Sequence, residues 1–135
     1  MPAKESQITA RIIAMLRARG AYAVKQHGSR FGSKGVPDVL ACYRSRFIAI
    51  EVKRPGPDGR RPERSPTPHQ VRNIKDILRA SGAAIVATTL DQAETLLDSI
   101  DEQIALAERQ TRIRDEAVRR VAALDLDLDK EEKPS

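Results

Sequence analysis

Hydrophobic residues along the first ninety positions follow helical and strand spacing in turn. Ile8, Ile12, Met15 and Leu16 recur at helical spacing and predict a helix over residues 4–19, which Gly20 ends. Residues 21–26 predict a strand, and residues 38–43 and 47–53 predict an antiparallel hairpin around a polar connection at 44–46. A second helix is expected from Thr67 to Gly82, followed by a buried strand at 83–88. The predicted element order is therefore α-β-β-β-α-β.

The C-terminal third of the chain has a different pattern. A capping box at Thr89-x-x-Gln92 opens a helix with apolar residues at helical spacing, and the helical pattern continues with mixed charges to Leu124. We expect residues 125–135 to be disordered. The predicted organisation is one α/β domain over residues 1–98 and a tail over 99–135 that is helical and then disordered.

The predicted hairpin carries the candidate chemistry. Because side chains alternate along a strand, Glu51 and Lys53 share one face of the returning strand, and a simple register places Asp38 opposite them. The two carboxylates and the backbone carbonyl of Val52 are hard oxygen ligands that suit Mg²⁺, with Mn²⁺ as a substitute. Such an ion polarises a phosphodiester and activates a bound water, while the Lys53 ammonium offsets developing charge. The pattern predicts metal-dependent hydrolysis of a nucleic-acid backbone.

These residues resemble the PD-(D/E)xK nuclease superfamily and, within it, the small stand-alone VRR-NUC type of phage and bacterial proteins. The matching motifs are Gly35-x-Pro37-Asp38, the run Ile50-Glu51-Val52-Lys53-Arg54-Pro55-Gly56, and Gln70. The resemblance covers about residues 5 to 90 and implies a restriction-endonuclease-like core, in which helices flank a mixed sheet. It also implies a metal-site role for Glu5 on the first helix and a place near the active site for Gln70.

Both of these supporting residues have a second interpretation. Glu5 lies where an acid favours the positive end of the helix dipole. Gln70 completes a Thr-x-x-Gln capping box with Thr67 at the start of the second helix. The sequence leaves these alternatives open.

Charge is distributed unevenly along the chain, whose net charge is +5. Residues 1–90 hold 17 Lys and Arg against 6 Asp and Glu, whereas residues 91–135 hold 7 against 13. Because the basic part contains the candidate site, we interpret it as a phosphate-binding surface, the alternative being an ordinary solvated surface. The residues expected to contact the nucleic-acid backbone lie in the glycine-rich loop 27–35 and in the proline-rich segment 54–66. They are Arg30, Lys34, Arg54, Arg60, Arg61 and Arg64. We interpret segment 54–66 as a mobile arm beside the site, the alternative being a simple linker.

Other classes of protein are disfavoured. Cys42 is the only cysteine, so the chain can form neither an intramolecular disulfide nor a thiolate zinc cluster. The sequence contains no Gly-x-Gly-x-x-Gly or Walker pattern. With no membrane-spanning run and no signal peptide, we expect a cytoplasmic protein of a bacterial or phage-infected cell, without membrane contact.

The sequence therefore favours a Mg²⁺-dependent nuclease acting on DNA. A basic surface that reads backbone shape, with few aromatic residues for stacking, suits branched DNA, and the resembled family implies a homodimer similar to a Holliday junction resolvase. The alternatives are a catalytically inert nucleic-acid-binding module and a general repair or restriction nuclease. An inert module usually lacks a carboxylate or the lysine, and none is missing here.

Overall fold

The computed structural model describes residues 4–28, 32 and 34–131. The chain divides into two compact units, residues 1–97 and 98–135. The elements are α1 (Glu5–Ala18), β1 (Tyr22–Lys25), β2 (Val39–Tyr43), β3 (Arg46–Val52), α2 (Pro68–Arg79), β4 (Ala83–Ala87) and α3 (Leu90–Glu131). The predicted order of elements is confirmed.

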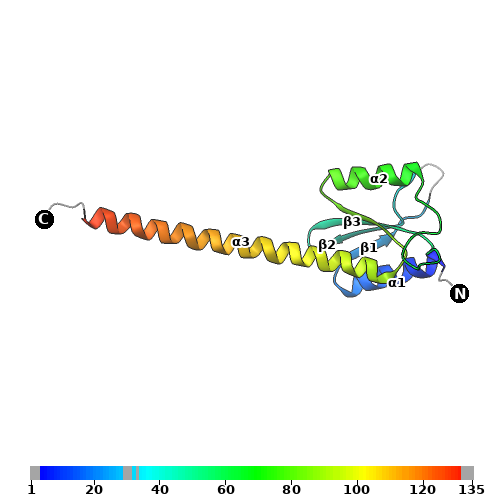
Figure 1. Ribbon diagram of the computed structural model, residues 1–135, viewed down its shortest axis with the longest axis horizontal. Coiled ribbons are helices and arrows are strands. Elements are labelled where there is room, and N and C mark those ends of the chain that lie inside the picture. The colour runs from blue at the N-terminus through cyan, green and yellow to red at the C-terminus, as the bar shows by residue number, and fades with distance from the viewer. Residues whose placement is uncertain (1–3, 29–31, 33, 132–135) are drawn as a thin grey trace. The chain divides into compact units, whose positions relative to one another are not determined.

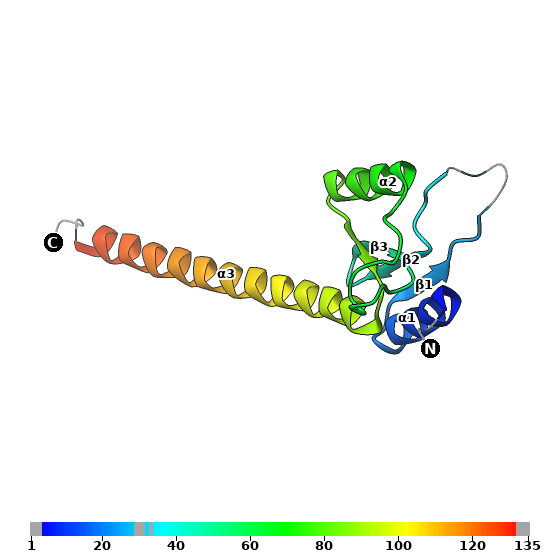
Figure 2. The ribbon, with the colours of Figure 1, turned by 45° about the vertical axis from the view of Figure 1, so that its right-hand side comes forward.

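The four strands form one mixed sheet in the order β1-β2-β3-β4 (Figure 1). β1, β2 and β3 are antiparallel neighbours, and β4 lies parallel to β3 because α2 carries the chain back across the sheet. Figures 1 and 2 show α1 and the start of α3 on one face of the sheet and α2 on the other. A mixed sheet flanked by helices is the predicted architecture.

The hairpin between β2 and β3 turns more tightly than predicted. Tyr43 pairs with Arg46, so Arg46 belongs to β3 and only Arg44 and Ser45 form the turn. Both turn residues have positive φ, 50° and 67°, as a type I′ turn requires. The polar run 44–46 did not predict this boundary correctly, because polar side chains indicate a turn without determining its length.

The core lies mainly between the sheet and α1. The fully buried side chains there include Ile12, Leu16, Val39 and Ile48. α2 covers the opposite face more loosely: none of its residues is buried, and Leu78 remains 51% exposed. The second helix therefore leaves room for polar side chains on its side of the sheet.

Residues 54–66 do not form the unstructured arm that their composition predicts. Pro55 pairs with Pro62, and the amide of Glu63 donates to the carbonyl of Arg54 at 2.9 Å, so the segment folds back on itself. The hydroxyl of Thr88 donates to the carbonyl of Arg60 at 2.8 Å and fixes the far end. The segment lacks apolar contacts, and it is held in place by its own backbone hydrogen bonds and by the hydrogen bond from the distant Thr88.

Helix α3 also continues further than predicted, through Asp125 to Glu131. Residues 125–131 contain neither Gly nor Pro, and they alternate Leu and Lys with acids that a helix accepts. The rest of the predicted disordered end, residues 132–135, lies outside the described residues. Within the described part of the chain, no helix is both long and apolar enough to cross a membrane.

Candidate active site

The structure brings Asp38 and Glu51 together across the hairpin. Val39 pairs with Ile50, so continuing the same register by one residue places Asp38 opposite Glu51. The Asp38 carboxylate accepts a hydrogen bond of 2.8 Å from the backbone amide of Val52, which fixes its position at the end of the strand pair. The juxtaposition predicted from strand periodicity is present.

Glu51 is held in an environment that opposes its negative charge. The residue is 3% exposed, and its Oε2 atom is buried with no hydrogen-bond partner. Burial and the neighbouring Asp38 carboxylate raise the pKa of Glu51 to about 8, although the Lys53 ammonium, 3.9 Å from Oε1, acts in the opposite direction. A second cationic partner would satisfy this carboxylate.

A divalent cation fits this pair of acids. It would neutralise the repulsion between Asp38 and Glu51 and give the unpartnered Oε2 a ligand, and the carbonyl of Val52 is the adjacent backbone oxygen. Among the residues that the structure describes, no cluster of three or more His, Cys, Asp and Glu could hold a metal. The candidate metal site is therefore the pair Asp38 and Glu51, and a metal contact by Glu5 stays a prediction.

Gln70 serves both of the functions that the sequence left open. Its side-chain oxygen accepts a hydrogen bond from the amide of Thr67 at 2.9 Å, and the Thr67 hydroxyl accepts from the Gln70 amide, which completes the capping box. Its side-chain nitrogen donates to Oε1 of Glu51 at 2.7 Å. One side chain thus ties the start of α2 to the candidate catalytic acid.

Gly35 fits against the backbone at the start of α2. Its φ is +78°, and a Cβ at this position would lie 2.5 Å from the carbonyl carbon of His69. Asn73 reinforces this contact by donating to the carbonyls of both Lys34 and His69 at 2.9 Å. The glycine of the Gly-x-Pro-Asp motif therefore allows the loop to pack against α2 immediately before Asp38.

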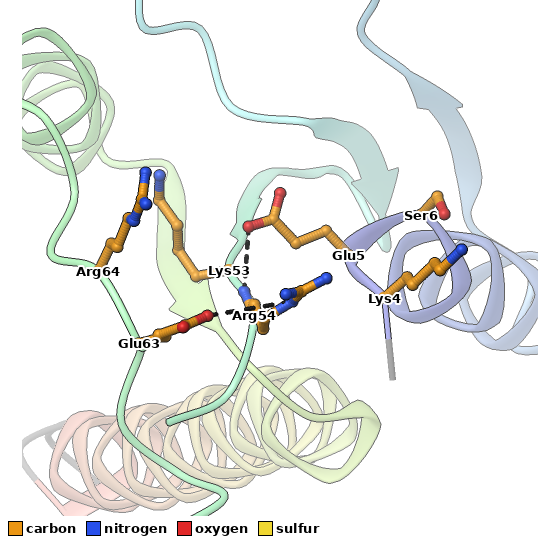
Figure 3. A pocket seen from close by; sticks show the side chains of 7 residues that line it. All are labelled: Lys4, Glu5, Ser6, Lys53, Arg54, Glu63 and Arg64. Carbon is orange, nitrogen blue, oxygen red and sulfur yellow. Dashed lines mark hydrogen bonds and ion pairs between the residues drawn. The ribbon is translucent and has the colours of Figure 1, made fainter. Parts of the chain in front are cut away.

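A cavity of about 550 Å³ opens beside Lys53 (Figure 3). It is lined by Lys4, Glu5, Ser6, Lys53, Arg54, Glu63 and Arg64. Glu5 accepts a hydrogen bond of 3.1 Å from the backbone amide of Arg54, and Glu63 lies 4.0 Å from the Arg54 guanidinium. Glu5 thus supports the backbone that follows Lys53, and its predicted contact with a metal ion stays a prediction.

The other predicted DNA contacts are distributed differently. Lys34 lines a separate cavity together with Asp38 and His27. Arg60 and Arg61 lie at the far end of the folded segment, and neither lines the cavity beside Lys53. Arg30 lies outside the described residues. Sequence reasoning missed Lys4 as a wall of that cavity, and its position at the helix start gives no signal that would have identified it.

Two carboxylates at the ends of adjacent strands, with a lysine two residues after the second, define the PD-(D/E)xK class of nucleases. The comparison with protein families agrees: the family described as "Archaeal holliday junction resolvase (hjc)" matches residues 1–127. The chain belongs to this family and is a nuclease.

Solved structures resemble the chain in fold. A protein titled "VRR_NUC domain" aligns with a TM-score of 0.57 and 23% identity, over 70% of this chain and 94% of its own. A second, "VRR_NUC domain protein", aligns with a TM-score of 0.56 and 16% identity, over 73% and 88%. Archaeoglobus fulgidus Hjc, a Holliday junction resolvase, shares 23% identity over 60% of this chain and 64% of its own, with a TM-score of 0.45. No curated protein matches the chain. The predicted restriction-endonuclease-like fold is confirmed.

Proposed function

We propose that this protein is a Mg²⁺-dependent endonuclease that hydrolyses phosphodiester bonds of DNA at branch points. The observation that carries the proposal is the buried Glu51 carboxylate, which faces Asp38 with one oxygen unpartnered and has the Lys53 ammonium 3.9 Å from its other oxygen. An acid pair of this kind destabilises the fold unless a cation joins it. Its presence in a nuclease family therefore favours a bound metal ion as part of the working site.

In the proposed site, Asp38, Glu51 and the carbonyl of Val52 hold the ion. Bound Mg²⁺ supplies a Lewis acid for the phosphodiester and lowers the pKa of a water. Lys53 contributes a fixed positive charge where negative charge develops on the phosphate. Gln70 keeps Glu51 in one orientation through its hydrogen bond, so that the carboxylate meets the ion without reorganising.

The cavity beside Lys53 is the proposed path of the DNA backbone. Lys4, Arg54 and Arg64 line it, so its charge suits a phosphate that neighbours the one being cleaved. Contacts of this kind recognise the position and shape of a backbone and carry no base sequence. This supports selectivity for the geometry of a branch.

The name of the family supports a four-way junction as the substrate. A junction presents backbones related by a two-fold axis, and a two-fold homodimer would place one site on each of two strands. We therefore propose a homodimer that binds a four-way junction more tightly than linear duplex and makes paired nicks near the branch.

The test compares junction, linear duplex, single-stranded and plasmid DNA, each with Mg²⁺, Mn²⁺ or EDTA. Asp38→Asn, Glu51→Gln and Lys53→Ala should each lose nearly all cleavage while retaining most of the junction affinity, because affinity depends on many phosphate contacts. Asp76→Asn, which changes an exposed acid on α2, serves as the matched control and should cleave normally. Binding without cleavage by the unaltered protein would indicate an inert binding module, and equal cutting of junction and duplex would indicate a general nuclease.

A further inference from the structure

A second cavity, of about 320 Å³, opens at Asp38. Its lining residues all come from the segment that leads from β1 to β2, and they are Gln26, His27, Gly28, Gly32, Lys34, Gly35, Val36 and Asp38. None of these residues lines the cavity beside Lys53. Because Asp38 belongs both to this lining and to the acid pair, the cavity is called the Asp38 cavity below.

Gln26 lies directly opposite Asp38 in the sheet. Lys25 is the last residue of β1 and pairs with Val39. The backbone amide of Gln26 donates to the carbonyl of Asp38 at 2.7 Å, so the same register continues by one residue. Residues that face one another across antiparallel strands present their side chains on the same face. Gln26, Asp38 and Glu51 therefore form one row, about 10 Å long across three strands.

The lining of the Asp38 cavity suits an anion. Lys34 carries a positive charge, and the side chains of Gln26 and His27 each offer an N–H donor. All three residues are exposed to solvent. Asp38 is the single acid of the lining, and a cation held between Asp38 and Glu51 would neutralise it. Since one carboxylate beside a lysine is a poor set of metal ligands, the lining favours a phosphate group.

Glycines and α2 determine the shape of this cavity. Gly28, Gly32 and Gly35 add no side chains to it, and a Cβ on Gly28 would meet no atom within 4 Å. A bulky phosphate can therefore come close to the backbone. The carbonyl of Lys34 accepts a hydrogen bond of 2.9 Å from the Asn73 side chain. The lysine backbone is thus fixed to α2, and its exposed side chain takes no part in that contact.

The two cavities flank the acid pair along the end of the sheet. The strand order β1-β2-β3 places Gln26 on one side of Asp38 and Glu51 on the other. Lys53 follows Glu51 by two residues and lines the other cavity together with Arg64. A DNA backbone that crosses from one cavity to the other therefore passes the acid pair.

We propose that the Asp38 cavity binds a backbone phosphate of the cleaved DNA strand, beside the phosphate that is hydrolysed. Lys34 supplies the charge, and Gln26 and His27 supply hydrogen bonds. The DNA strand then runs over the acid pair to the cavity beside Lys53, so the two cavities hold phosphates on opposite sides of the cleaved bond. The inference rests on the proposed function, since it requires a protein that cleaves DNA. Each chain of the proposed homodimer holds one strand in this way, which agrees with paired nicks at one branch.

The experiment combines each side-chain variant with a single uncharged phosphate. The DNA that the native protein cleaves fastest is synthesised with one methylphosphonate, a neutral replacement for a phosphate, at successive positions on either side of the mapped cleavage site. The ratio kcat/KM in Mg²⁺ is measured for the native protein and for Lys34→Met, Gln26→Leu, His27→Leu and Arg64→Met. A variant that has lost a contact should respond less when the contacted phosphate is made neutral.

The expected responses differ between the two cavities. The native protein should lose at least about tenfold in kcat/KM when the phosphate in the Asp38 cavity is made neutral. On the same DNA the loss for Lys34→Met should be at least about threefold smaller, because its charge is already absent. Gln26→Leu and His27→Leu should each show a smaller loss at this same position. Arg64→Met should show its smaller loss at a phosphate on the opposite side of the cleaved bond.

Arg46→Met is the matched control. Arg46 is exposed, lies at the start of β3 and lines neither cavity. It is five residues from Glu51, which is about 17 Å along a strand. This variant should keep the native response at every position. Circular dichroism melting of all the variants should match that of the native protein, because every side chain that is changed is exposed.

Two results would overturn this inference alone. If Lys34→Met responds like the native protein at every position, the Asp38 cavity does not hold a phosphate. If Lys34→Met and Arg64→Met lose their responses on the same side of the cleaved bond, the DNA strand does not run from one cavity to the other. In both cases the native protein still cleaves unmodified DNA, and the proposed function stands. A native protein that cleaves no DNA would overturn the proposed function and this inference together.

Discussion

Replacing Glu51 by Gln should stabilise the protein when no divalent cation is bound. Burial and Asp38 raise the pKa of Glu51 from 4.5 to about 8, so the native state holds a proton that the unfolded chain releases above pH 4.5. Because the native state binds more protons, its free energy of unfolding falls as the pH rises from 4.5 to about 8. Glutamine is neutral at every pH and does not incur this loss.

The size of the effect follows from the interval between the unfolded pKa and the working pH. From pH 4.5 to pH 7 the interval is about 2.5 units, and each unit corresponds to about 1.4 kcal/mol. The upper bound is therefore about 3.5 kcal/mol at pH 7, which corresponds to a rise in melting temperature on the order of 10 °C for a chain of this size. Gln70 can still donate to the carbonyl oxygen of the new amide, so this hydrogen bond is retained.

Thermal unfolding of both proteins from pH 4.5 to 8 in EDTA measures the difference. The melting temperature of the Glu51→Gln variant should exceed that of the native protein by an amount that grows with pH. Adding 10 mM Mg²⁺ should reduce or reverse this difference, because the ion binds the native acid pair. Asp76→Asn, at an exposed acid, should show no such trend. A variant less stable than the native protein at pH 7 in EDTA, or a difference independent of pH, would refute the assignment of a destabilising buried carboxylate.

Three further variants test the surroundings of the site. Changing Arg60, Arg61 and Arg64 together to Ala should flatten the dependence of log K for DNA binding on log salt concentration. The slope should fall by up to about 0.9 for each phosphate that these arginines neutralise, and an unchanged slope would exclude a role for this segment in DNA binding. Gly35→Ala should unfold the loop or the protein, since its Cβ meets the His69 backbone at 2.5 Å, and a melting temperature equal to that of the native protein would contradict this. Thr88→Val should cost about 1 kcal/mol in urea unfolding by removing the bond to the Arg60 carbonyl, and no change would show that this bond is unimportant.

The acid pair could be predicted from sequence because its geometry is local. Strand periodicity determines that Glu51 and Lys53 share a face, and a short hairpin determines which residue lies opposite. The exact turn decides this result: the predicted connection at 44–46 would pair Tyr43 with Phe47 and put Asp38 opposite Val52, whereas the observed pairing of Val39 with Ile50 puts Asp38 opposite Glu51. Gln70 could be placed only in part, since its capping function is local and its bond to Glu51 spans nineteen residues.

The features that the sequence did not predict depend on contacts between distant segments. Composition alone makes residues 54–66 look unstructured, but Thr88 holds their far end from 28 residues away. The bond from Arg54 to Glu5 joins residues 49 apart, and no spacing rule predicts it. The Gly-x-Pro-Asp motif identified Gly35 in the sequence, but it did not show why a glycine is required there. The reason is the close approach of the His69 backbone.

The candidate site retains several local features that a fold selected for stability alone would avoid. Glu51 is buried with an unpartnered oxygen, and Gly35 holds a positive φ against the start of α2. These features meet at one place because Gln70, at the start of α2, also donates to Glu51. A cation bound between Asp38 and Glu51 would remove the largest of these unfavourable contributions, which is the unpartnered oxygen of the buried Glu51. It would bind next to the segment that Gly35 and Gln70 hold in position. Metal binding and the position of residues 35–38 are therefore expected to be coupled.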